Sequence, residues 1–343
     1  MTALTAIEPA APQEAAADAG LHYATDDAPG LRRTRRGKGF SYIDAQGRLV
    51  SLAERNRIKA LVIPPAWQGV WISPDPKAHL LATGRDARGR KVYLYHPRWR
   101  EVRDQAKFER LGDFADALPD LRGSVEADLG RPGFPAEKVV ALVVRLLDDT
   151  LIRIGNERYA EDNESFGLTT LRSEHVDISG SRVRFDFVGK SGVVHELDLR
   201  DARLARLAKR CHELPGKHLF SYLDEEGSVG AVSSADVNDY LRDRMGDRVS
   251  AKDFRTWGGT IIAAHTLAHP CADDQPCDGH VRRCYEEAAE VLGNTPTVCR
   301  ASYVHPVVPA SYQQGSLAEA WRGARSTTTL SRREQMVRRL LDV

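Results

Sequence analysis

Apolar and polar residues alternate with different periods along this chain, and the change of period divides it into three parts. Residues 1–29 are rich in Ala with scattered Pro and Asp, show no apolar period, and predict a disordered leader. Over residues 30–97, short apolar runs separated by turn residues are typical of strands. Over residues 98–343, most apolar positions recur at helical spacing. The pattern predicts a small β-rich domain followed by a larger, mostly helical one.

The β-rich domain is expected to begin with a hairpin. It runs from FSYI at residues 40–43, through a turn at residues 44–47, to Leu49 and Val50. The stretch RRTRRGK at residues 32–38, which contains five cations, leads into this hairpin. The basic lead-in places positive charge beside the first predicted strands.

A second hairpin joins residues 79–83 to residues 91–95 through a polar loop that contains Gly. Side chains alternate across a strand, so one face of its second strand carries two apolar residues, and the other carries a cation and two phenols. The polar face is either the rim of a half-buried edge strand or, together with the basic lead-in, a surface that contacts phosphates. Its residues are Lys91, Tyr93 and Tyr95.

The larger domain is expected to combine helices with one small sheet. A helical stripe of apolar residues covers residues 136–151, and a GKSG turn at residues 189–192 separates two of three strand-like runs. The predicted fold class is therefore α+β: a small β-rich N-terminal domain plus a mostly α-helical domain that contains a three-stranded antiparallel sheet. The three strands are expected at residues 168–171, 183–188 and 193–199.

Composition excludes several classes of protein. The 343 residues contain no apolar run of about 18 that could span a bilayer. Residues 1–20 lack the basic start and apolar middle of a secretion signal. Five cysteines, an odd number, argue against a disulfide framework and suit a reducing compartment. These observations exclude a membrane protein and predict a cytoplasmic one.

The formal net charge of +1 conceals an uneven distribution. Residues 1–30 contain five carboxylates and neither Lys nor Arg, so they carry −5, and residues 31–343 carry +6. The body of the protein is therefore mildly basic. A total near zero consequently does not exclude nucleic acid as a partner.

Motifs for common cofactors are absent from the sequence. The GKS at residues 189–191 lacks the first Gly of a nucleotide-binding P-loop, because Arg184 stands there. No dinucleotide fingerprint, HExxH helix or GxSxG elbow occurs. One loop rich in His and Cys has spacings that match no structural zinc pattern; a metal site or a Cys271–Cys277 disulfide stays open but is not required. We expect no cofactor and no metal. The loop residues are His265, His269, Cys271, Cys277, His280 and Cys284.

The segment LGNTPTVCRASYVHP, which begins at Leu292, is the most informative in the chain. Gly293 can end one helix, and Thr295, followed by Pro, can start the next. Asn294 then lies at the junction, and Tyr303 lies two turns into the second helix. A Leu-Gly-(His or Asn) corner nine residues before a Tyr resembles the active-site end of the tyrosine recombinases and type IB DNA topoisomerases.

Four further motifs are similar to this superfamily and follow its order. KDFRTWG at residues 252–258 looks like the Lys-x-x-Arg-Thr-(aromatic)-Gly motif of type IB topoisomerases, where recombinases usually have His-x-x-Arg. IRIG at 152–155 and the residues after it look like the segment with the first catalytic arginine. FVGK at 187–190 looks like the catalytic-lysine hairpin, and GRKVYLY at 89–95 looks like the N-terminal hairpin that touches DNA. Over about residues 31–310, the chain is identified as a member of the bacterial, poxvirus-like type IB topoisomerases.

The resemblance implies the fold of the DNA breaking-rejoining enzymes and a mechanism. The protein would relax supercoiled duplex DNA as a monomer in the cytoplasm, associated with the nucleoid. It would cleave one strand through a 3′-phosphotyrosyl intermediate, without ATP or metal. Asn294 stands where poxvirus enzymes have His, so here that donor is uncharged. The implied catalytic residues are Arg153, Lys190, Arg255, Asn294 and Tyr303. The implied DNA-contacting residues are Lys91, Tyr93, Tyr95, Tyr159 and Lys252.

The residue types suit this chemistry. Arg153 and Arg255 can present forked donors to the nonbridging phosphate oxygens, where charge gathers in the transition state. A cationic pocket favours the phenolate of Tyr303, and Lys190, on a Gly-flanked turn, can protonate the leaving 5′ oxygen. Two alternatives are a tyrosine recombinase or integrase with the same chemistry and a non-catalytic DNA-binding protein. Lys252 and the β-rich N-terminal domain disfavour the first, and the complete set of reactive side chains disfavours the second.

Overall fold

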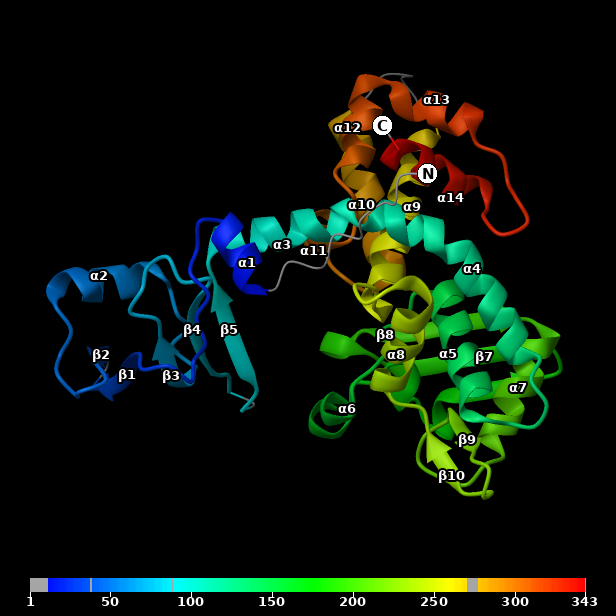
Figure 1. The fold of residues 1–343 in the computed structure, drawn as a ribbon, viewed down its shortest axis with the longest axis horizontal. Helices are drawn as coiled ribbons and strands as arrows, with labels where there is room; N and C mark the ends of the chain where they lie inside the picture. Colours follow the sequence, from blue (N-terminus) through cyan, green and yellow to red (C-terminus); the bar gives the residue numbers. More distant parts are fainter. Residues whose placement is uncertain (1–11, 38, 88, 270–276, 343) are drawn as a thin grey trace, which may run out of the picture. The chain divides into compact units, whose positions relative to one another are not determined.

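The computed structural model describes residues 12–37, 39–87, 89–269 and 277–342, apart from the side chains of Pro12, Arg100 and Tyr159 (Figure 1). The chain forms two compact units, residues 1–107 and 108–343, and each has its own hydrophobic core. The boundary expected from the sequence, near residue 97, lies at the start of helix α3 (Pro97–Glu109), which continues past the division at residue 107. Within the described ranges, no helix is both long and apolar enough to cross a membrane.

The N-terminal unit contains an antiparallel five-stranded sheet in the order β2-β1-β3-β4-β5. Helix α2 (Leu52–Ala60) is capped at its N-terminus by Ser51, whose hydroxyl accepts a hydrogen bond from the backbone N–H of Glu54. This helix contributes Ile58 to the same core as the sheet. The strands are β1 (Leu31–Arg36), β2 (Gly39–Ile43), β3 (Gln68–Ile72), β4 (Leu80–Arg85) and β5 (Lys91–Tyr95).

The first hairpin differs from the prediction. The basic stretch expected to lead into it is itself strand β1, which pairs with β2, and Gly37 between them has a φ of 59°. The predicted turn at residues 44–47 forms as well, but beyond it a single bridge joins Ile43 to Leu49. A run rich in cations can form a strand because alternate side chains face solvent. Arg33, at a half-buried position, donates hydrogen bonds to three backbone carbonyls.

The predicted disordered leader is wrong for the part of it that the structure describes. Helix α1 (Pro12–Asp18) packs into a small cluster in which Ala16 and Ala19 are buried beside Trp99. The chain then joins the sheet region through backbone hydrogen bonds. The N–H of His22 donates to the carbonyl of Lys77, and the carbonyl of His22 accepts from the N–H of His79. Small Ala side chains allow this close packing, and a search for periodic large apolar residues does not detect it.

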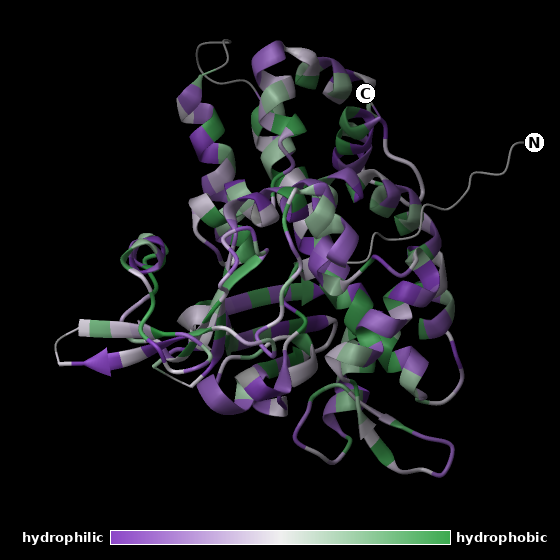
Figure 2. Cartoon of the chain, turned by 60° about the vertical axis from the view of Figure 1, so that its left-hand side comes forward, coloured by the Kyte–Doolittle hydropathy of each residue, from purple (hydrophilic) through white to green (hydrophobic). Residues whose placement is uncertain are grey.

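The C-terminal unit packs helices around an antiparallel sheet ordered β6-β7-β8. The hydrophobic side chains of β7 alternate with polar ones, and Val183, Phe185 and Phe187 enter the core. Figure 2 shows hydrophobic and hydrophilic residues interspersed along the helices and strands of the chain. The strands are β6 (Val176–Ser179), β7 (Arg182–Val188) and β8 (Val194–Arg200), with β9 (Ser221–Leu223) and β10 (Val229–Ala231) as a separate pair. The helices are α4 (Leu111–Leu129), α5 (Ala136–Thr150), α6 (Glu157–Asn163), α7 (Ala202–His212), α8 (Ser234–Met245), α9 (Ala251–Ala268), α10 (Asp278–Leu292), α11 (Pro296–Ser302), α12 (Val307–Gln314), α13 (Ser316–Gly323) and α14 (Arg332–Leu341).

The three-stranded sheet is confirmed, but its first strand lies elsewhere. The run expected as that strand contains a buried 3₁₀ turn, Leu168–Thr170, and β6 follows several residues later. The backbone N–H groups of Leu168 and Thr169 donate to the carbonyls of Arg153 and Ile154 instead of to a strand of the sheet. A short buried apolar run has no period that distinguishes a strand from a turn.

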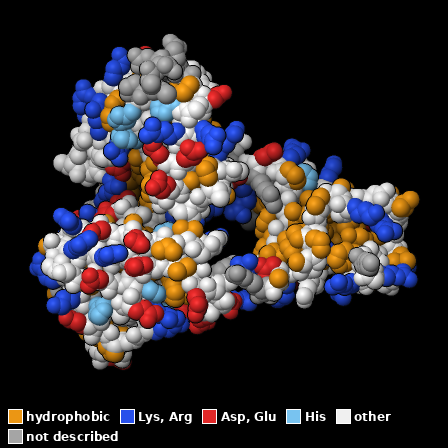
Figure 3. All heavy atoms as spheres, turned by 180° about the vertical axis from the view of Figure 1, so that it is seen from behind, with side chains coloured by type: hydrophobic (Ala, Val, Ile, Leu, Met, Phe, Trp, Pro, Cys, Tyr) orange, Lys and Arg blue, Asp and Glu red, His pale blue; other side chains and the backbone are white. Residues whose placement is uncertain are grey.

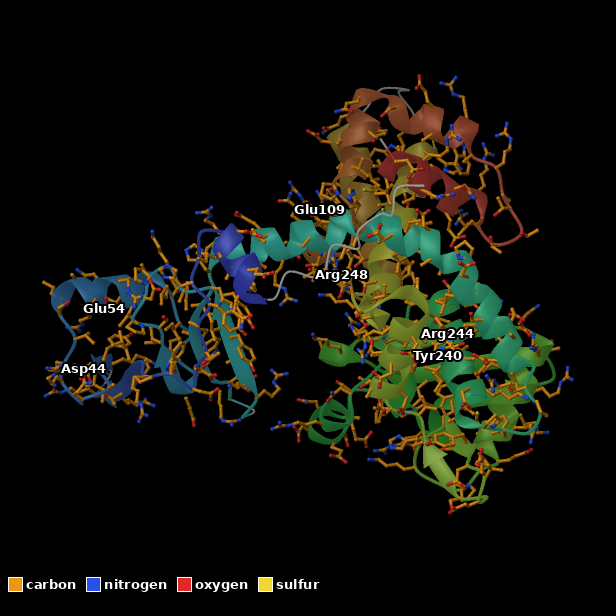
Figure 4. All side chains as sticks on the ribbon, viewed as in Figure 1. Asp44, Glu54, Glu109, Tyr240, Arg244 and Arg248 are labelled. Atoms are coloured by element: carbon orange, nitrogen blue, oxygen red, sulfur yellow. The ribbon has the colours of Figure 1, made fainter. Side chains whose placement is uncertain are left out.

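A buried carboxylate connects α4 to α8. Asp128, on α4, accepts hydrogen bonds from the Tyr240 hydroxyl and the Arg244 guanidinium, both at 2.9 Å. Tyr240 and Arg244 lie side by side on α8 (Figure 4), with the guanidinium carbon 3.5 Å from the ring centroid. Asp128 also pairs with Arg131 (2.6 Å), so its charge is compensated from both sides, and the bonds to Tyr240 and Arg244 are the ones that join the two helices.

Candidate active site

The connection between α10 and α11 forms a tight corner at Gly293 and Asn294. Gly293 has a φ of 57°, the left-handed conformation that ends many helices. The backbone N–H of Asn294 donates to the carbonyl of Ala289 (2.9 Å). Thr295 then caps α11 by accepting a hydrogen bond from the N–H of Val298. The helix junction expected from the sequence is therefore confirmed.

Arg153 lies in the segment that follows α5 and reaches this corner. Its Nη2 donates to Oδ1 of Asn294 (2.6 Å) and, at 3.4 Å, to the carbonyl of Gly293. The contact fixes which side of the amide faces the arginine, because only its oxygen accepts hydrogen bonds. The Asn294 amide nitrogen is therefore directed away from Arg153.

Arg255 lies in the second turn of α9 and is only 3% exposed. Its Nη1 donates to the backbone carbonyl of Leu151, directly after α5, and its Nη2 donates to the carbonyl of Leu292 at the end of α10 (2.6 Å). One guanidinium therefore joins the elements that carry the other two polar groups of the site, Arg153 and Asn294. Hydrogen bonds from a charged donor are among the stronger ones in proteins.

Tyr303 follows directly on α11, which ends at Ser302, so it lies one residue beyond the helix and not inside it. Its carbonyl accepts a hydrogen bond from the Thr260 hydroxyl on α9 (3.3 Å). A Cβ added at Gly259 would lie 2.8 Å from the same carbonyl, so glycine allows this close approach. The guanidinium carbon of Arg255 lies 5.2 Å from the centroid of the phenol ring.

Three buried donors at this site have no hydrogen-bond partner within the described residues. They are Nη1 of Arg153, Nε of Arg255 and Nδ2 of Asn294. An unpartnered buried donor costs about 1–3 kcal/mol, so such groups are uncommon. Because their side chains contact one another or the same backbone corner, they can together bind the oxygens of one anion, such as a phosphate.

The charges at the site shift the pKa of Tyr303 and of both arginines. Burial raises the pKa of the Tyr303 phenol, but the charges of Arg255, Arg153 and Lys252 outweigh burial and bring it below 10. Burial and the charge of Arg153 lower the pKa of Arg255 to about 10. Burial also lowers the pKa of Arg153. In the part of the chain that the structure describes, neither arginine pairs with a carboxylate, so the site favours anions and a phenolate.

Lys190 is exposed in the turn between β7 and β8 and is not placed among the arginines. The turn is closed by a hydrogen bond from the N–H of Gly189 to the carbonyl of Val193 (2.7 Å). The imidazole of His195 lies against both Gly189 and Gly293, so it connects the Lys190 turn to the corner of the site. No pattern in the sequence assigns His195 a role of its own, because its contact with Gly293 joins residues far apart in the chain.

The predicted DNA-contacting residues of the N-terminal unit lie on β5, which forms the second expected hairpin with β4. Nζ of Lys91 forms an ion pair with Asp26 (2.7 Å), a residue of the segment expected to be disordered. Tyr93 is 45% exposed and stacks on Tyr95, with ring centroids 5.9 Å apart. Tyr95 is half-buried against the α1 cluster. Lys91 and Tyr93 are therefore the more accessible of the three.

The remaining predicted residues are described to different extents. Lys252 is exposed in the first turn of α9, on the helix that carries Arg255. Tyr159 belongs to α6, but its side chain lies outside the described residues. Cys271, of the His- and Cys-containing loop, also lies outside them. Among the residues that are described, no group of three or more His, Cys, Asp or Glu side chains could hold a metal ion. The expected loop position is wrong for His265, which lies on α9 and packs beside Trp321, and for His280 and Cys284, which lie on α10.

Comparisons with known proteins show the family to which this chain belongs. A family model described as the catalytic core of eukaryotic DNA topoisomerase I matches residues 96–321, and one described as the N-terminal domain of bacterial DNA topoisomerase IB matches residues 39–86. The DNA topoisomerase 1B of Acanthamoeba polyphaga mimivirus is 31% identical over 294 residues, 83% of this chain and 88% of that protein. The DNA topoisomerase 1B of vaccinia virus (strain Copenhagen) is 24% identical over 236 residues, 66% of this chain and 70% of that protein. This chain belongs to the type IB DNA topoisomerases, a family of isomerases.

Proposed function

We propose that this protein relaxes supercoiled duplex DNA by cutting and rejoining one strand, with Tyr303 as the nucleophile. The observation that carries the proposal is the set of three unpartnered buried donors beside a phenol whose pKa is lowered. A DNA phosphodiester has two nonbridging oxygens that need such donors, because negative charge grows on them as the nucleophile attacks. Arg153, Arg255 and Asn294 supply these donors, and Lys190 serves the leaving group.

In the cleavage step, the phenolate of Tyr303, which has already lost its proton to solvent, forms a bond from its oxygen to phosphorus while the bond from phosphorus to the 5′ oxygen breaks. The electron pair of the broken bond stays on the 5′ oxygen, which takes a proton from Lys190. The enzyme is left joined to the 3′ phosphate, so the phosphodiester energy is conserved. The reverse step rejoins the strand without ATP. Rotation of the free 5′ end between the two steps releases supercoils.

Side chains supply the charge stabilisation in this proposal. Each lost donor of this kind typically costs about 10²–10³ in rate. Arg153 and Arg255 bring full positive charges, and Asn294 adds a neutral donor whose contribution does not depend on protonation. Because these groups neutralise the phosphate themselves, we expect activity without a divalent cation or a nucleotide.

Duplex DNA is the proposed partner, and one chain carries every proposed catalytic residue, so a monomer suffices. Lys side chains bind phosphates as point charges, and tyrosine hydroxyls donate to phosphate oxygens. Such an enzyme would act in the cytoplasm, on the nucleoid. The proposed DNA-contacting residues are Lys91, Tyr93, Tyr95, Tyr159 and Lys252.

Plasmid relaxation tests the proposal. The protein is incubated with negatively supercoiled plasmid in EDTA without ATP, and we expect relaxation by the wild type and none by Tyr303→Phe. Tyr222→Phe, at a half-buried tyrosine on β9 remote in sequence from the site, is the matched control and should relax DNA at the wild-type rate. An inactive wild type, or undiminished relaxation by Tyr303→Phe, would overturn the proposal.

A modified substrate tests the role of Lys190. We expect Lys190→Ala to slow single-turnover cleavage by about 10²–10⁴, the usual contribution of a general acid. Replacing the bridging 5′ oxygen with sulfur makes a leaving group that needs no proton, so the variant should regain most of its rate. Arg255→Ala should not be rescued, because it acts on the nonbridging oxygens. Equal slowing of Lys190→Ala on both substrates would exclude Lys190 as the acid.

A further inference from the structure

His195, on β8, lies between two glycines that belong to different parts of the active site. A Cβ added at Gly189 would lie 2.6 Å from Cδ2 and 2.7 Å from Nε2 of the imidazole. A Cβ added at Gly293 would lie 3.1 Å from its Cε1. One edge of the ring therefore lies against the Lys190 turn, and the ring also contacts the corner that precedes Asn294.

The rest of its surroundings hold the ring in place. The imidazole stacks on Phe187, with centroids 5.0 Å apart and planes 16° apart. Burial lowers its pKa, and the charges of Arg153 and Arg255 lower it further, so the ring is neutral at physiological pH.

The two sides of this contact differ in how firmly they are held. The Gly293 corner is fixed by Arg153, by the bond from Asn294 to Ala289, and by Arg255 through the adjacent carbonyl of Leu292. The base of the Lys190 turn is held by hydrogen bonds from the Gly189 N–H to the Val193 carbonyl (2.7 Å) and from the Gly192 N–H and the Ser165 hydroxyl to the Gly189 carbonyl (both 3.2 Å), whereas Lys190 and Ser191 at its tip are exposed. The corner can therefore serve as a fixed support against which the ring holds the base of the turn, and with it the exposed tip that carries Lys190.

We propose that His195 is a positioning residue that holds the Lys190 turn at a set distance from the Gly293–Asn294 corner. This inference rests on the proposed function, because it concerns the placement of the proposed acid. The flat ring acts as a spacer: it fills the gap between the two glycines, and neither glycine could carry a side chain without displacing it. A shift of about 1 Å in a catalytic group can cost about 10² in rate, so a spacer of this kind matters for chemistry.

Single-turnover cleavage of oxygen and sulfur substrates tests the inference. We expect His195→Ala to slow cleavage of ordinary DNA by at least about 10-fold, and the 5′-sulfur substrate to restore most of the loss. Its DNA affinity should stay unchanged. His212→Ala, at an exposed histidine on α7, is the control and should cleave both substrates at the wild-type rate.

A second variant, Gly189→Ala, changes the glycine of the Lys190 turn that the His195 ring contacts. Gly189 has a φ of −94° and a ψ of −165°, which alanine adopts without strain, so Gly189→Ala acts only through its clash with the ring. It should show the same rescue by sulfur. The double variant Gly189→Ala/His195→Ala should be no slower than His195→Ala alone, because removing the ring removes the clash. Gly112→Ala, with nothing near its added Cβ, should have no effect.

The outcomes separate this inference from the proposed function. If the wild type does not cleave DNA, the proposed function fails. If the wild type cleaves and Lys190→Ala is rescued by sulfur, but His195→Ala is equally slow on both substrates or cleaves at the wild-type rate, only the role of His195 fails. Additive effects in the double variant would likewise contradict it.

Discussion

The two active-site arginines divide their donors between the protein and the expected substrate. Arg255 uses both Nη atoms to hold backbone carbonyls and leaves Nε buried without a partner within the described residues. Nη2 of Arg153 donates to Asn294, and Nη1 of Arg153 is likewise buried without a partner within the described residues. The bonds to the protein fix each guanidinium before DNA arrives, so little reorganisation is needed in the transition state.

The lowered pKa of Tyr303 predicts a pH dependence. Because the phenolate attacks, cleavage of the 5′-sulfur substrate should rise with pH and level off once the pH exceeds this pKa, which lies below 10. Arg255→Ala removes the largest of the charges that lower the pKa, so the midpoint should move to higher pH. The maximum rate should fall by about 10²–10³. Quenched single-turnover cleavage across the pH range measures both; an unchanged midpoint in the variant would contradict the role assigned to Arg255.

In the N-terminal unit, Asp26 forms an ion pair with Lys91, the cation that we propose to bind a DNA phosphate. Its carboxylate pairs with Lys91 and also accepts a hydrogen bond from Thr83 (2.9 Å). The hydrogen bond from Lys91 is the largest effect that keeps the pKa of Asp26 below its usual value. A phosphate must displace this carboxylate before it can bind Lys91, so the ion pair opposes DNA binding.

Neutralising Asp26 should therefore tighten DNA binding. We expect Asp26→Asn to lower the Kd for duplex DNA several-fold and to steepen the salt dependence by up to about one counterion, because Lys91 becomes available to a phosphate. Asp18→Asn removes the same charge from α1 at an exposed position and serves as the control. Fluorescence anisotropy at several salt concentrations measures both quantities. Equal effects of the two substitutions would indicate a general charge effect and not release of Lys91.

At the scale of elements, two glycines allow the Arg153 segment to lie against the turn that precedes β6. A Cβ added at Gly167 would lie 2.5 Å from both the Arg153 carbonyl and the Gly155 nitrogen. Gly155 itself has a φ of 98°, which side chains rarely adopt. The segment that presents Arg153 is therefore placed by a backbone-to-backbone contact.

Gly167→Ala should disturb both stability and cleavage. The added methyl meets backbone atoms that cannot rotate away, so we expect a loss of about 1–3 kcal/mol in the free energy of unfolding. Cleavage should fall more than DNA affinity, because Arg153 is displaced. Gly123→Ala, in the interior of α4 with open space around its Cβ, should instead stabilise the fold by up to about 1 kcal/mol. Denaturant unfolding and single-turnover cleavage check the pair, and an unaffected Gly167→Ala would refute the close contact.

At the scale of the whole molecule, charged side chains of both signs are spread over the surface, whereas the proposed catalytic residues all lie in the C-terminal unit. Figure 3 shows Lys and Arg side chains interspersed with Asp and Glu over the face that it draws, consistent with a net charge of +1. Arg153 and Arg255, which pair with no carboxylate among the described residues, lie together at the active site. We infer that DNA binding depends on local contacts more than on long-range attraction.

The C-terminal unit should still cleave DNA when it is separated from the N-terminal unit. All five proposed catalytic residues lie in residues 108–343, which have their own core. We expect this fragment to cleave DNA at a rate close to the full chain once DNA is saturating, but to need a much higher DNA concentration. Single-turnover rates measured against DNA concentration separate the two effects. A fragment that folds yet cannot cleave at any concentration would show that the N-terminal unit contributes to the chemistry.

Much of the fold could be predicted because its signals are local. The left-handed Gly293, the Thr295 cap and the alternation along β7 each depend on a few neighbouring residues, so the sequence determined them. Predictions failed where local patterns were ambiguous. The buried run near Leu168 has no period that distinguishes a strand from a turn, and α1 packs through small Ala side chains that form no apolar stripe.

The sequence by itself determined which side chains carry the proposed chemistry, because phosphodiester transfer needs particular donors and a nucleophile, and these stand in a recognisable order. Only the tertiary structure decided how they meet. Arg153 contacts Asn294 across 141 positions, Arg255 joins the ends of α5 and α10, and His195 lies between two distant glycines. No local period encodes such contacts, because they depend on how separate elements pack against one another.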